Sequence, residues 1–163
     1  MIILTPMRTE AFESFAEEAI AGYATDNVQS GRWPSELALE RARSEFRGLL
    51  HQGLQTPDHF VFEIQHHPTG EPVGVLWFAI VESGGVRSGY VYNIRIQPEY
   101  RGRGYAKAAL DLIEKFAVSH GLFSMALHVF SFNTGAQALY RSIGYGISGM
   151  NMFKPLRRNG AGP

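Results

Sequence analysis

The sequence YVYNIRIQPEYRGRGYA, residues 90–106, sets a strand, a glycine-bearing loop and the start of a helix in direct succession. The strand ends at Gln97 and Pro98, and the helix after the loop is rich in alanine. The first turn of a helix leaves N–H groups unpaired, and the helix dipole adds positive potential there. Gly102 and Gly104 let the backbone approach a ligand closely. The stretch therefore predicts an anion site, with one alternative left open: a tight turn that needs its glycines only for their dihedral angles.

Side chains around this loop also favour an anion. Ala106 leaves room at the first helical turn, and Arg101, Arg103 and Lys107 add positive charge at its mouth. Two familiar phosphate motifs do not fit, because the chain has no G-x-x-x-x-G-K-[ST] and the loop lacks the G-x-G-x-x-G spacing. A protein that binds nucleotide phosphates through the same loop is kept as one hypothesis.

Hydrophobic periodicity on both sides of the loop predicts the remaining elements. The expected helices cover residues 9–28, 34–50, the alanine-rich segment up to Gly121, and a segment capped by Asn133 that runs to residue 143. The expected strands cover residues 2–6, 59–65, 73–81, 90–97 and 125–130, and one or two more cover residues 145–155. The strand–helix–strand connection in this order implies one parallel pair within a mixed, mostly antiparallel sheet. The fold class is thus α/β, or more narrowly α+β, with about four helices around the sheet.

Composition limits the classes of function. With 163 residues, 45% of them hydrophobic, we expect a single domain over residues 1–156 and a flexible tail over residues 157–163. A net charge of zero gives no reason to expect nucleic acid or an anionic membrane as a partner. The chain has no cysteine, so any acyl transfer would be direct rather than through a thiol. The N-terminus resembles no signal peptide, which predicts a cytoplasmic protein, and a homodimer is left open.

Two motifs together carry a family resemblance. Arg101, Gly104 and Ala106 fit the signature [QR]-x-x-G-x-[GA], and about 30 residues downstream stands a second motif, N-x-x-A-x-x-L-Y-x-x-x-G-Y, over residues 133–145. With the strand that precedes the loop, they make the chain resemble the GCN5-related N-acetyltransferase (GNAT) superfamily. The resemblance covers nearly the whole chain. Within the superfamily, the chain is similar to a bacterial subgroup whose substrates are largely unassigned.

The resemblance implies acetyl-CoA as co-substrate, held between the splayed strands 90–97 and 125–130. Main-chain groups of Ile94, Arg95 and Ile96 would bind the pantetheine chain, while alternation also makes Ile94 and Ile96 core residues. Asn133 and Ala136 would lie beside the pantetheine, and Asn133 would also cap its helix. The pyrophosphate would bind the loop residues Arg101, Gly102, Arg103, Gly104, Tyr105, Ala106 and Lys107.

The resemblance also makes Tyr140 the candidate general acid that protonates the departing thiolate; packing alone is the alternative. Many relatives carry a carboxylate near Asn93, which cannot accept a proton at neutral pH. Asn93 could orient the acceptor amine or a water, or serve the strand alone. Other candidates for the base are Glu82, His128 and the pair Glu17 and Glu18. A solvated helix face is the simpler interpretation of Glu17 and Glu18. A structural role is the simpler interpretation of His128. The amine could also lose its proton to water, with no dedicated base.

The acceptor is expected to be a primary amine of a small molecule, a protein or a peptide. An aromatic-lined acceptor site could be formed by Tyr23, Trp33, Trp77 and Tyr92, although such residues are commonly core. His66 and His67 point to opposite faces of a strand, so we expect no metal. The leading hypothesis is direct acetyl transfer, and the main alternative is a non-catalytic module that binds or senses acyl-CoA.

Overall fold

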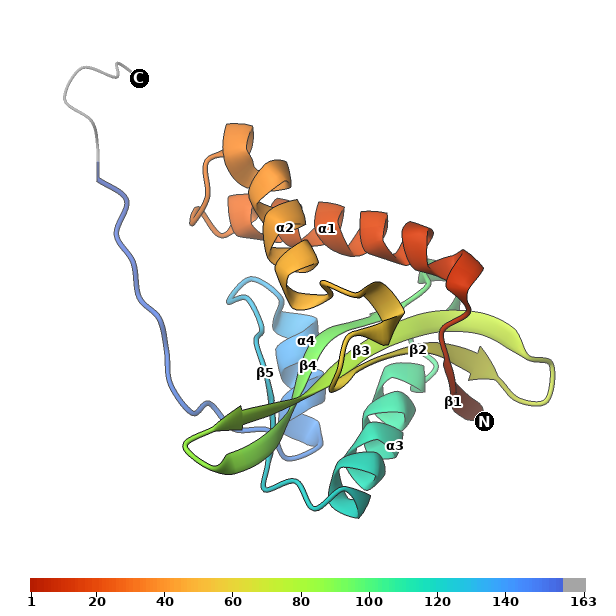
Figure 1. The fold of residues 1–163 in the computed structure, drawn as a ribbon. Helices are drawn as coiled ribbons and strands as arrows, with labels where there is room; N and C mark the ends of the chain where they lie inside the picture. Colours follow the sequence, from red (N-terminus) through yellow and green to blue (C-terminus); the bar gives the residue numbers. More distant parts are fainter. Residues whose placement is uncertain (157–163) are drawn as a thin grey trace.

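A computed structural model describes residues 1–156 of the chain (Figure 1). Its sheet has five strands in the order β1-β2-β3-β4-β5. The first three pairings are antiparallel, and β4 and β5 run parallel, as the sequence predicts. The strands are β1 (Ile2–Pro6), β2 (His59–His66), β3 (Glu71–Ser83), β4 (Val86–Ile96) and β5 (Met125–Leu127).

Four α-helices cover the two faces of the sheet. Two of them, α1 (Phe12–Gln29) and α2 (Ser35–Leu49), follow β1 and pack on one face. The other two, α3 (Tyr105–Ser119) and α4 (Thr134–Ser142), lie on the opposite face. Each helix falls where apolar spacing predicts it, and α3 begins directly at the glycine-bearing loop.

The sheet separates two hydrophobic cores. The α1–α2 core contains Phe15, Phe46 and Trp77, with ring centroids of Phe46 and Trp77 5.4 Å apart. The α3–α4 core contains Phe78 and Leu110, both almost fully buried. Alternation along β3 sends Trp77 to one core and Phe78 to the other, because successive side chains of a strand point to opposite faces.

The parallel contact between β4 and β5 is short. Only three residue pairs connect the strands, from Gly89 opposite Met125 to Val91 opposite Leu127. A Cβ atom on Gly89 would lie 2.5 Å from the Phe78 ring and 2.6 Å from the Met125 sulfur, so only glycine lets these side chains pack here. The two strands are thus tightly joined at one end and separate after Val91.

The C-terminal quarter differs from the prediction. The strand expected over residues 125–130 ends at Leu127, and the strand expected over residues 145–155 does not form. A strand requires a hydrogen-bonding neighbour, and residues 145–155 do not reach one within the described chain. The tail expected over residues 157–163 lies outside the described residues.

A buried carboxylate on β2 is held by a neighbour on the same strand and by a residue far away in the sequence. Glu63 is only 3% exposed. It accepts hydrogen bonds from Arg8 Nε at 3.0 Å and from Gln65 Nε2 at 3.0 Å. Burial by itself raises the pKa of Glu63, but the hydrogen bonds from Gln65 and Arg8 outweigh it, and the pKa lies below its usual value. The carboxylate is therefore ionised and paired in the folded protein.

Replacing Glu63 with alanine is expected to lower the free energy of unfolding by about 2 kcal/mol at pH 7, because hydrogen bonds to a buried charge are lost. A lowered folded pKa stabilises the protein above the unfolded pKa and loses that contribution as the pH falls through the folded value. The difference between Glu63→Ala and the wild type should thus shrink in acid. Urea unfolding at neutral and acidic pH measures it, with Glu40→Ala, an exposed site on α2, as control. Equal effects of the two substitutions would contradict the role of Glu63.

Candidate functional site

The separation of β4 from β5 leaves one edge of β4 open. On its other side β4 stays paired with β3 up to Ile96, which lies opposite Gly74. Toward β5 the pairing stops at Val91, so residues 92–96 have no strand neighbour there within the described chain. Backbone N–H and C=O groups along an unpaired edge are available to an extended ligand in the manner of an added strand.

An irregularity in β4 coincides with this separation. Asn93 lies opposite Trp77, but the next residue of β3, Phe78, lies opposite Val91, so Tyr92 is an extra residue on β4. Such a bulge bends a strand and increases its twist, and bulges are frequent beside active sites. The side-chain oxygen of Asn93 is buried at this bend and has no hydrogen-bond partner among residues 1–156. A buried polar atom without a partner is uncommon in a folded protein, so this oxygen is a candidate for a ligand contact.

The loop before α3 is shaped for an anion. Gly102 and Gly104 have φ angles of 74° and 78°, in the left-handed region that favours glycine. A Cβ atom on either would meet nothing within 4 Å, so the space above both is open. The backbone N–H groups of residues 102–107 donate to no acceptor in the described part of the chain, and α3 has no side-chain cap. These N–H groups and the helix dipole form a concave set of donors.

The basic side chains of the loop form bonds within the protein. Arg101 donates from Nε to the Ile96 carbonyl at 3.0 Å, which fixes the loop to the end of β4. Arg103 donates to the Glu99 carbonyl at 3.1 Å, and its guanidinium lies 5.4 Å from the centre of the Tyr100 ring. Lys107 pairs with Asp111 one turn further along α3, at 3.6 Å. Backbone donors are therefore the main anion-binding groups, with the arginines supplying nearby charge.

Helix α4 carries two of the predicted residues, Asn133 at its N-cap and Tyr140 in its second turn. Asn133 accepts a hydrogen bond at Oδ1 from the Ala136 N–H at 3.1 Å and so caps α4, as the sequence predicts. Asn133 is exposed, and its side-chain amide NH2 group makes no hydrogen bond within residues 1–156. The cap and the free donor are compatible, because different atoms of the side chain serve them.

Tyr140 lies two turns into α4, at the margin of the α3–α4 core. Its ring centroid is 5.8 Å from that of Tyr145. Burial raises the pKa of Tyr140, so the phenol keeps its proton at neutral pH. The hydroxyl forms no hydrogen bond with any other described residue. A protonated, half-buried hydroxyl without a partner is able to donate a proton or a hydrogen bond to a bound molecule.

The four aromatic residues predicted to surround the acceptor form two separate pairs. Tyr23 meets Trp33 edge to face at 5.3 Å, and Trp77 stacks on Tyr92 at 4.7 Å. Both tryptophans are buried in the α1–α2 core, where the Trp77 indole N–H donates to His59 Nδ1 at 3.0 Å. Tyr23 and Tyr92 retain more exposed surface. The rings therefore do not line one common surface, and packing accounts for the tryptophans.

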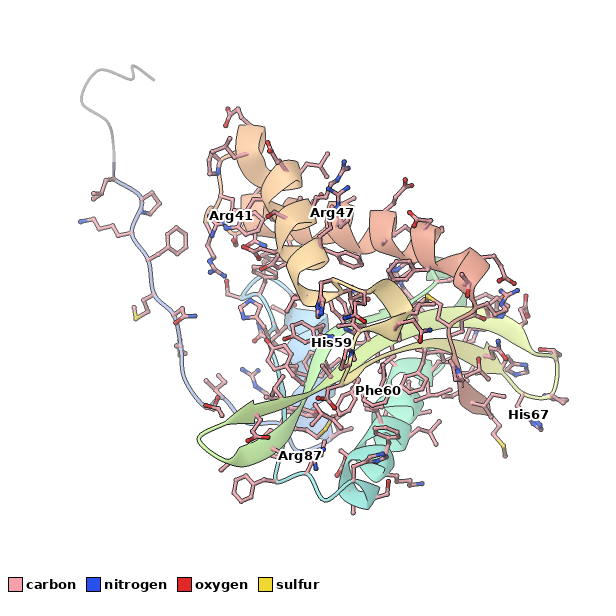
Figure 2. The ribbon with its side chains drawn as sticks, viewed as in Figure 1. Arg41, Arg47, His59, Phe60, His67 and Arg87 are labelled. Atoms are coloured by element: carbon pink, nitrogen blue, oxygen red, sulfur yellow. The ribbon has the colours of Figure 1, made fainter. Side chains whose placement is uncertain are left out.

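The candidate bases lie in different places. Glu82 is opposite Arg87 at the β3–β4 hairpin, at the end of β4 away from the open edge (Figure 2). Glu18 is exposed on α1, as expected, and it forms a surface ion pair with Arg95 on the open part of β4. His128 is exposed, and partial burial of its ring, with the nearby charge of Arg32, lowers its pKa. Glu17 is exposed on α1.

Two interactions here were not predicted from the sequence. The ion pair of Glu18 with Arg95 joins α1 to β4 over a long sequence separation, and no local pattern signals it. His59 stacks on Tyr92 and accepts the Trp77 hydrogen bond, and burial lowers its pKa. Alternation along β2 places His59 on the same face of the sheet as Trp77. This alternation was the one sequence signal for their contact.

Two kinds of feature are missing from residues 1–156. No group of three or more His, Cys, Asp or Glu side chains gathers there as metal ligands would. Among the same residues, no helix has the length and apolar character to cross a membrane.

Comparisons with known proteins agree on one family. The family model described as "Acetyltransferase (GNAT) family" matches residues 17–145. The uncharacterized N-acetyltransferase YycN of Bacillus subtilis (strain 168) is 34% identical over 155 residues, or 95% of this chain and 99% of YycN. The N-acetyltransferase YdgE of the same organism is 29% identical over 94% of this chain and 97% of YdgE. A crystal structure of YycN superposes with a TM-score of 0.89 over 97% of this chain and 100% of that one.

Proposed function

Because the chain belongs to the acetyltransferase (GNAT) family, we propose that it transfers the acetyl group of acetyl-CoA directly to a primary amine. The observation that carries this proposal is the array of backbone N–H groups of residues 102–107 at the start of α3, next to the open edge of β4. The array suits a pyrophosphate, and the edge suits the amide-bearing pantetheine chain that follows it in acetyl-CoA.

The donor site is built mainly from backbone. Residues 94–96 would bind the pantetheine amides through the main chain, and the loop over residues 101–107 would bind the pyrophosphate. The free amide NH2 of Asn133 is available to the pantetheine while Oδ1 caps α4, and Ala136 leaves space on the first turn. Backbone donors carry this recognition, because the side chains of Arg101, Arg103 and Lys107 already have partners within the protein.

Transfer requires that an amine nitrogen attack the carbonyl carbon of the thioester. The new C–N bond forms, the C–S bond breaks, and the electron pair of that bond leaves on sulfur. N–H groups on the open edge of β4 would polarise the carbonyl oxygen, and Tyr140 would give its proton to the thiolate. The nitrogen loses one proton, so proton uptake at sulfur and proton release at nitrogen balance.

Asn93 would orient the acceptor. Its buried oxygen has no partner among the described residues and lies at the bulge where β4 leaves β5, so it can accept a hydrogen bond from the attacking amine. An amide cannot take the proton away. Water is the simplest route for that proton, and the titratable groups in contact with this part of β4 include Glu18, which pairs with Arg95, and His59, which stacks on Tyr92.

The acceptor would enter from the side covered by α1, α2 and their connection. On that side Tyr23 is exposed and Tyr92 is half-buried, whereas Trp33 and Trp77 are packed beneath them in the core. The acceptor class we propose is a primary amine of a small molecule, a protein or a peptide.

A screen for thiol release tests the proposal. Purified protein, acetyl-CoA and a panel of amines should produce free CoA thiol with at least one acceptor, and mass spectrometry should find that acceptor heavier by one acetyl group. Stabilisation by acetyl-CoA without thiol release from any amine would instead favour the non-catalytic binding module, which the amide at Asn93 keeps open. Stabilisation by ATP or NAD but not by acetyl-CoA would contradict the donor site itself.

A further inference from the structure

Three aromatic rings meet beside the bulge of β4. The Trp77 indole stacks on the Tyr92 ring with centroids 4.7 Å apart, and the His59 imidazole stacks on the same tyrosine at 5.7 Å. His59 and Trp77 also contact each other, with centroids 5.8 Å apart. These residues, named here the ring triad, come from β2, β3 and β4, and Figure 2 labels His59. The extra residue of β4 therefore packs on side chains from two other strands.

A hydrogen bond within the ring triad determines which nitrogen of His59 carries the proton. Trp77 donates from its indole N–H to His59 Nδ1 at 3.0 Å. An indole nitrogen is a donor only, so Nδ1 acts as an acceptor and the proton of the neutral imidazole lies on Nε2. Burial lowers the pKa of His59, which favours the neutral ring at neutral pH. The hydrogen bond and the burial thus hold His59 in one tautomer.

Trp77 depends on this hydrogen bond for its only polar contact. It is 4% exposed, and the rings of Phe15 and Phe46 cover it from α1 and α2 at centroid distances of 6.2 and 5.4 Å. Its indole N–H donates to no other acceptor among residues 1–156. A buried donor that loses its partner is costly, so the position of His59 determines the orientation of the indole.

The ring triad borders the place proposed for the acceptor. Tyr92 is the extra residue of the bulge, and Asn93, which follows it, carries the buried side-chain oxygen that has no partner in the described part of the chain. A bulge redirects the side chains of its strand. The position of the Tyr92 ring and the direction of the Asn93 side chain are therefore coupled.

The part of β4 proposed for acetyl-CoA is held differently. Residues 94–96 pair in regular register with β3, opposite Leu76, Val75 and Gly74. This backbone ladder needs no contact with the ring triad. A disturbance of the ring triad should therefore reach the acceptor and leave the binding of acetyl-CoA intact.

We propose that His59 is a positioning residue of the acceptor site. Its hydrogen bond and ring contacts hold Trp77 and Tyr92, and through them the bulge of β4 and the side chain that orients the amine. This inference rests on the proposed function, because the site that it concerns is the one proposed for the amine. His59 is not the base in this arrangement, since Nδ1 accepts the indole N–H and Nε2 already carries a proton.

Acceptor kinetics test the proposal in the full chain, with an amine from the thiol-release screen. His59→Phe keeps a ring beside Tyr92 but leaves the buried indole N–H without an acceptor. It is expected to raise KM for the amine about tenfold or more, the effect of one unpaired buried donor, while the affinity for acetyl-CoA measured by calorimetry stays unchanged. His59→Asn places an amide oxygen near the position of Nδ1 and should restore most of the wild-type KM.

A second stacked histidine is the control. His120 stacks on Phe116 at 4.0 Å, at the end of α3 and outside the proposed acceptor site, so His120→Phe should leave KM for the amine unchanged. A lower melting temperature for His59→Phe with a wild-type KM would mean that the ring triad contributes only to stability, and it would overturn the proposal. Equal KM values for His59→Phe and His59→Asn, both above the wild type, would also overturn it, because the hydrogen bond would then have no part in the effect.

Nuclear magnetic resonance tests the positioning without an acceptor. In the wild type the His59 ring should be the Nε2–H tautomer, and the opposite tautomer would overturn the proposal whether or not a variant folds. In His59→Phe the side-chain amide signals of Asn93 should shift, and in His59→Asn they should return. These shifts without thiol release from any amine would support the coupling and contradict the proposed function alone. Unshifted Asn93 signals in an active enzyme would contradict the positioning alone.

Discussion

Substituting phenylalanine for Tyr140 is expected to lower kcat for acetyl transfer about a hundredfold or more, the usual contribution of a general acid. The change removes one hydroxyl and keeps the ring that packs at the margin of the α3–α4 core. Because burial holds the pKa of Tyr140 above its usual value, the hydroxyl carries its proton throughout the neutral range and is ready to protonate a thiolate. Affinity for acetyl-CoA should stay within a small factor of the wild type.

The neighbouring tyrosine is the matched control. Tyr145 lies 5.8 Å from Tyr140, ring to ring, and burial, with Glu114 and Tyr140 nearby, raises the pKa of Tyr145 to about 12. Tyr145→Phe removes the same atom from the same surroundings and should leave kcat close to wild type. Thiol release for chemistry and calorimetry for binding separate the two effects. Unchanged turnover in Tyr140→Phe would remove the acid assignment, and an equal loss in both variants would indicate packing.

The second large effect concerns the loop. Gly104→Val is expected to weaken acetyl-CoA binding by about a hundredfold or more, since losing two hydrogen bonds to a charged ligand costs about 3 kcal/mol. The substitution places a branched side chain in the open space above the loop and forces a residue that avoids positive φ to adopt 78°. Both changes disturb the donors of residues 102–107.

Gly121, at the other end of α3, separates strain from ligand binding. Its φ angle is 67°, and a Cβ atom there would also meet nothing within 4 Å. Gly121→Val thus imposes a similar backbone strain on the same helix, far from the loop, and should lower the melting temperature about as much while leaving acetyl-CoA affinity intact. Calorimetric titration of both variants with acetyl-CoA measures the two affinities. Equal losses of affinity would mean that the loop acts only through stability.

Elements that depend on local sequence were predicted well. The helices α1 to α4 and the mostly antiparallel sheet with its parallel pair β4–β5 fall where periodicity and glycine positions indicate. The Asn133 cap is also as predicted, because a cap needs only the residues of its own first turn. The loop before α3 belongs to this class, since its geometry follows from Gly102, Gly104 and the helix that they begin.

Features that depend on distant contacts were not predictable. The pairing of Arg8 with Glu63 joins residues 55 apart, and the pairing of Glu18 with Arg95 links a helix to a strand formed much later. A core position was expected for such aromatic residues as Trp33 and Trp77, but which of the four predicted around the acceptor are buried depends on how α1 and α2 pack on the sheet. The strand expected over residues 145–155 had the right composition, but no sequence pattern says whether a strand finds its neighbour within one chain.

The division of the interior into two cores on opposite faces of the sheet has an evolutionary consequence. The loop before α3 and Tyr140 border the α3–α4 core, while α1, α2 and the side that we propose for the acceptor border the α1–α2 core. Substitutions in separate cores combine nearly independently, because distant sites share few partners. If the proposed sites are correct, we expect that descendants of such a protein can repack the α1–α2 half and acquire a new acceptor while the other half continues to bind the same donor.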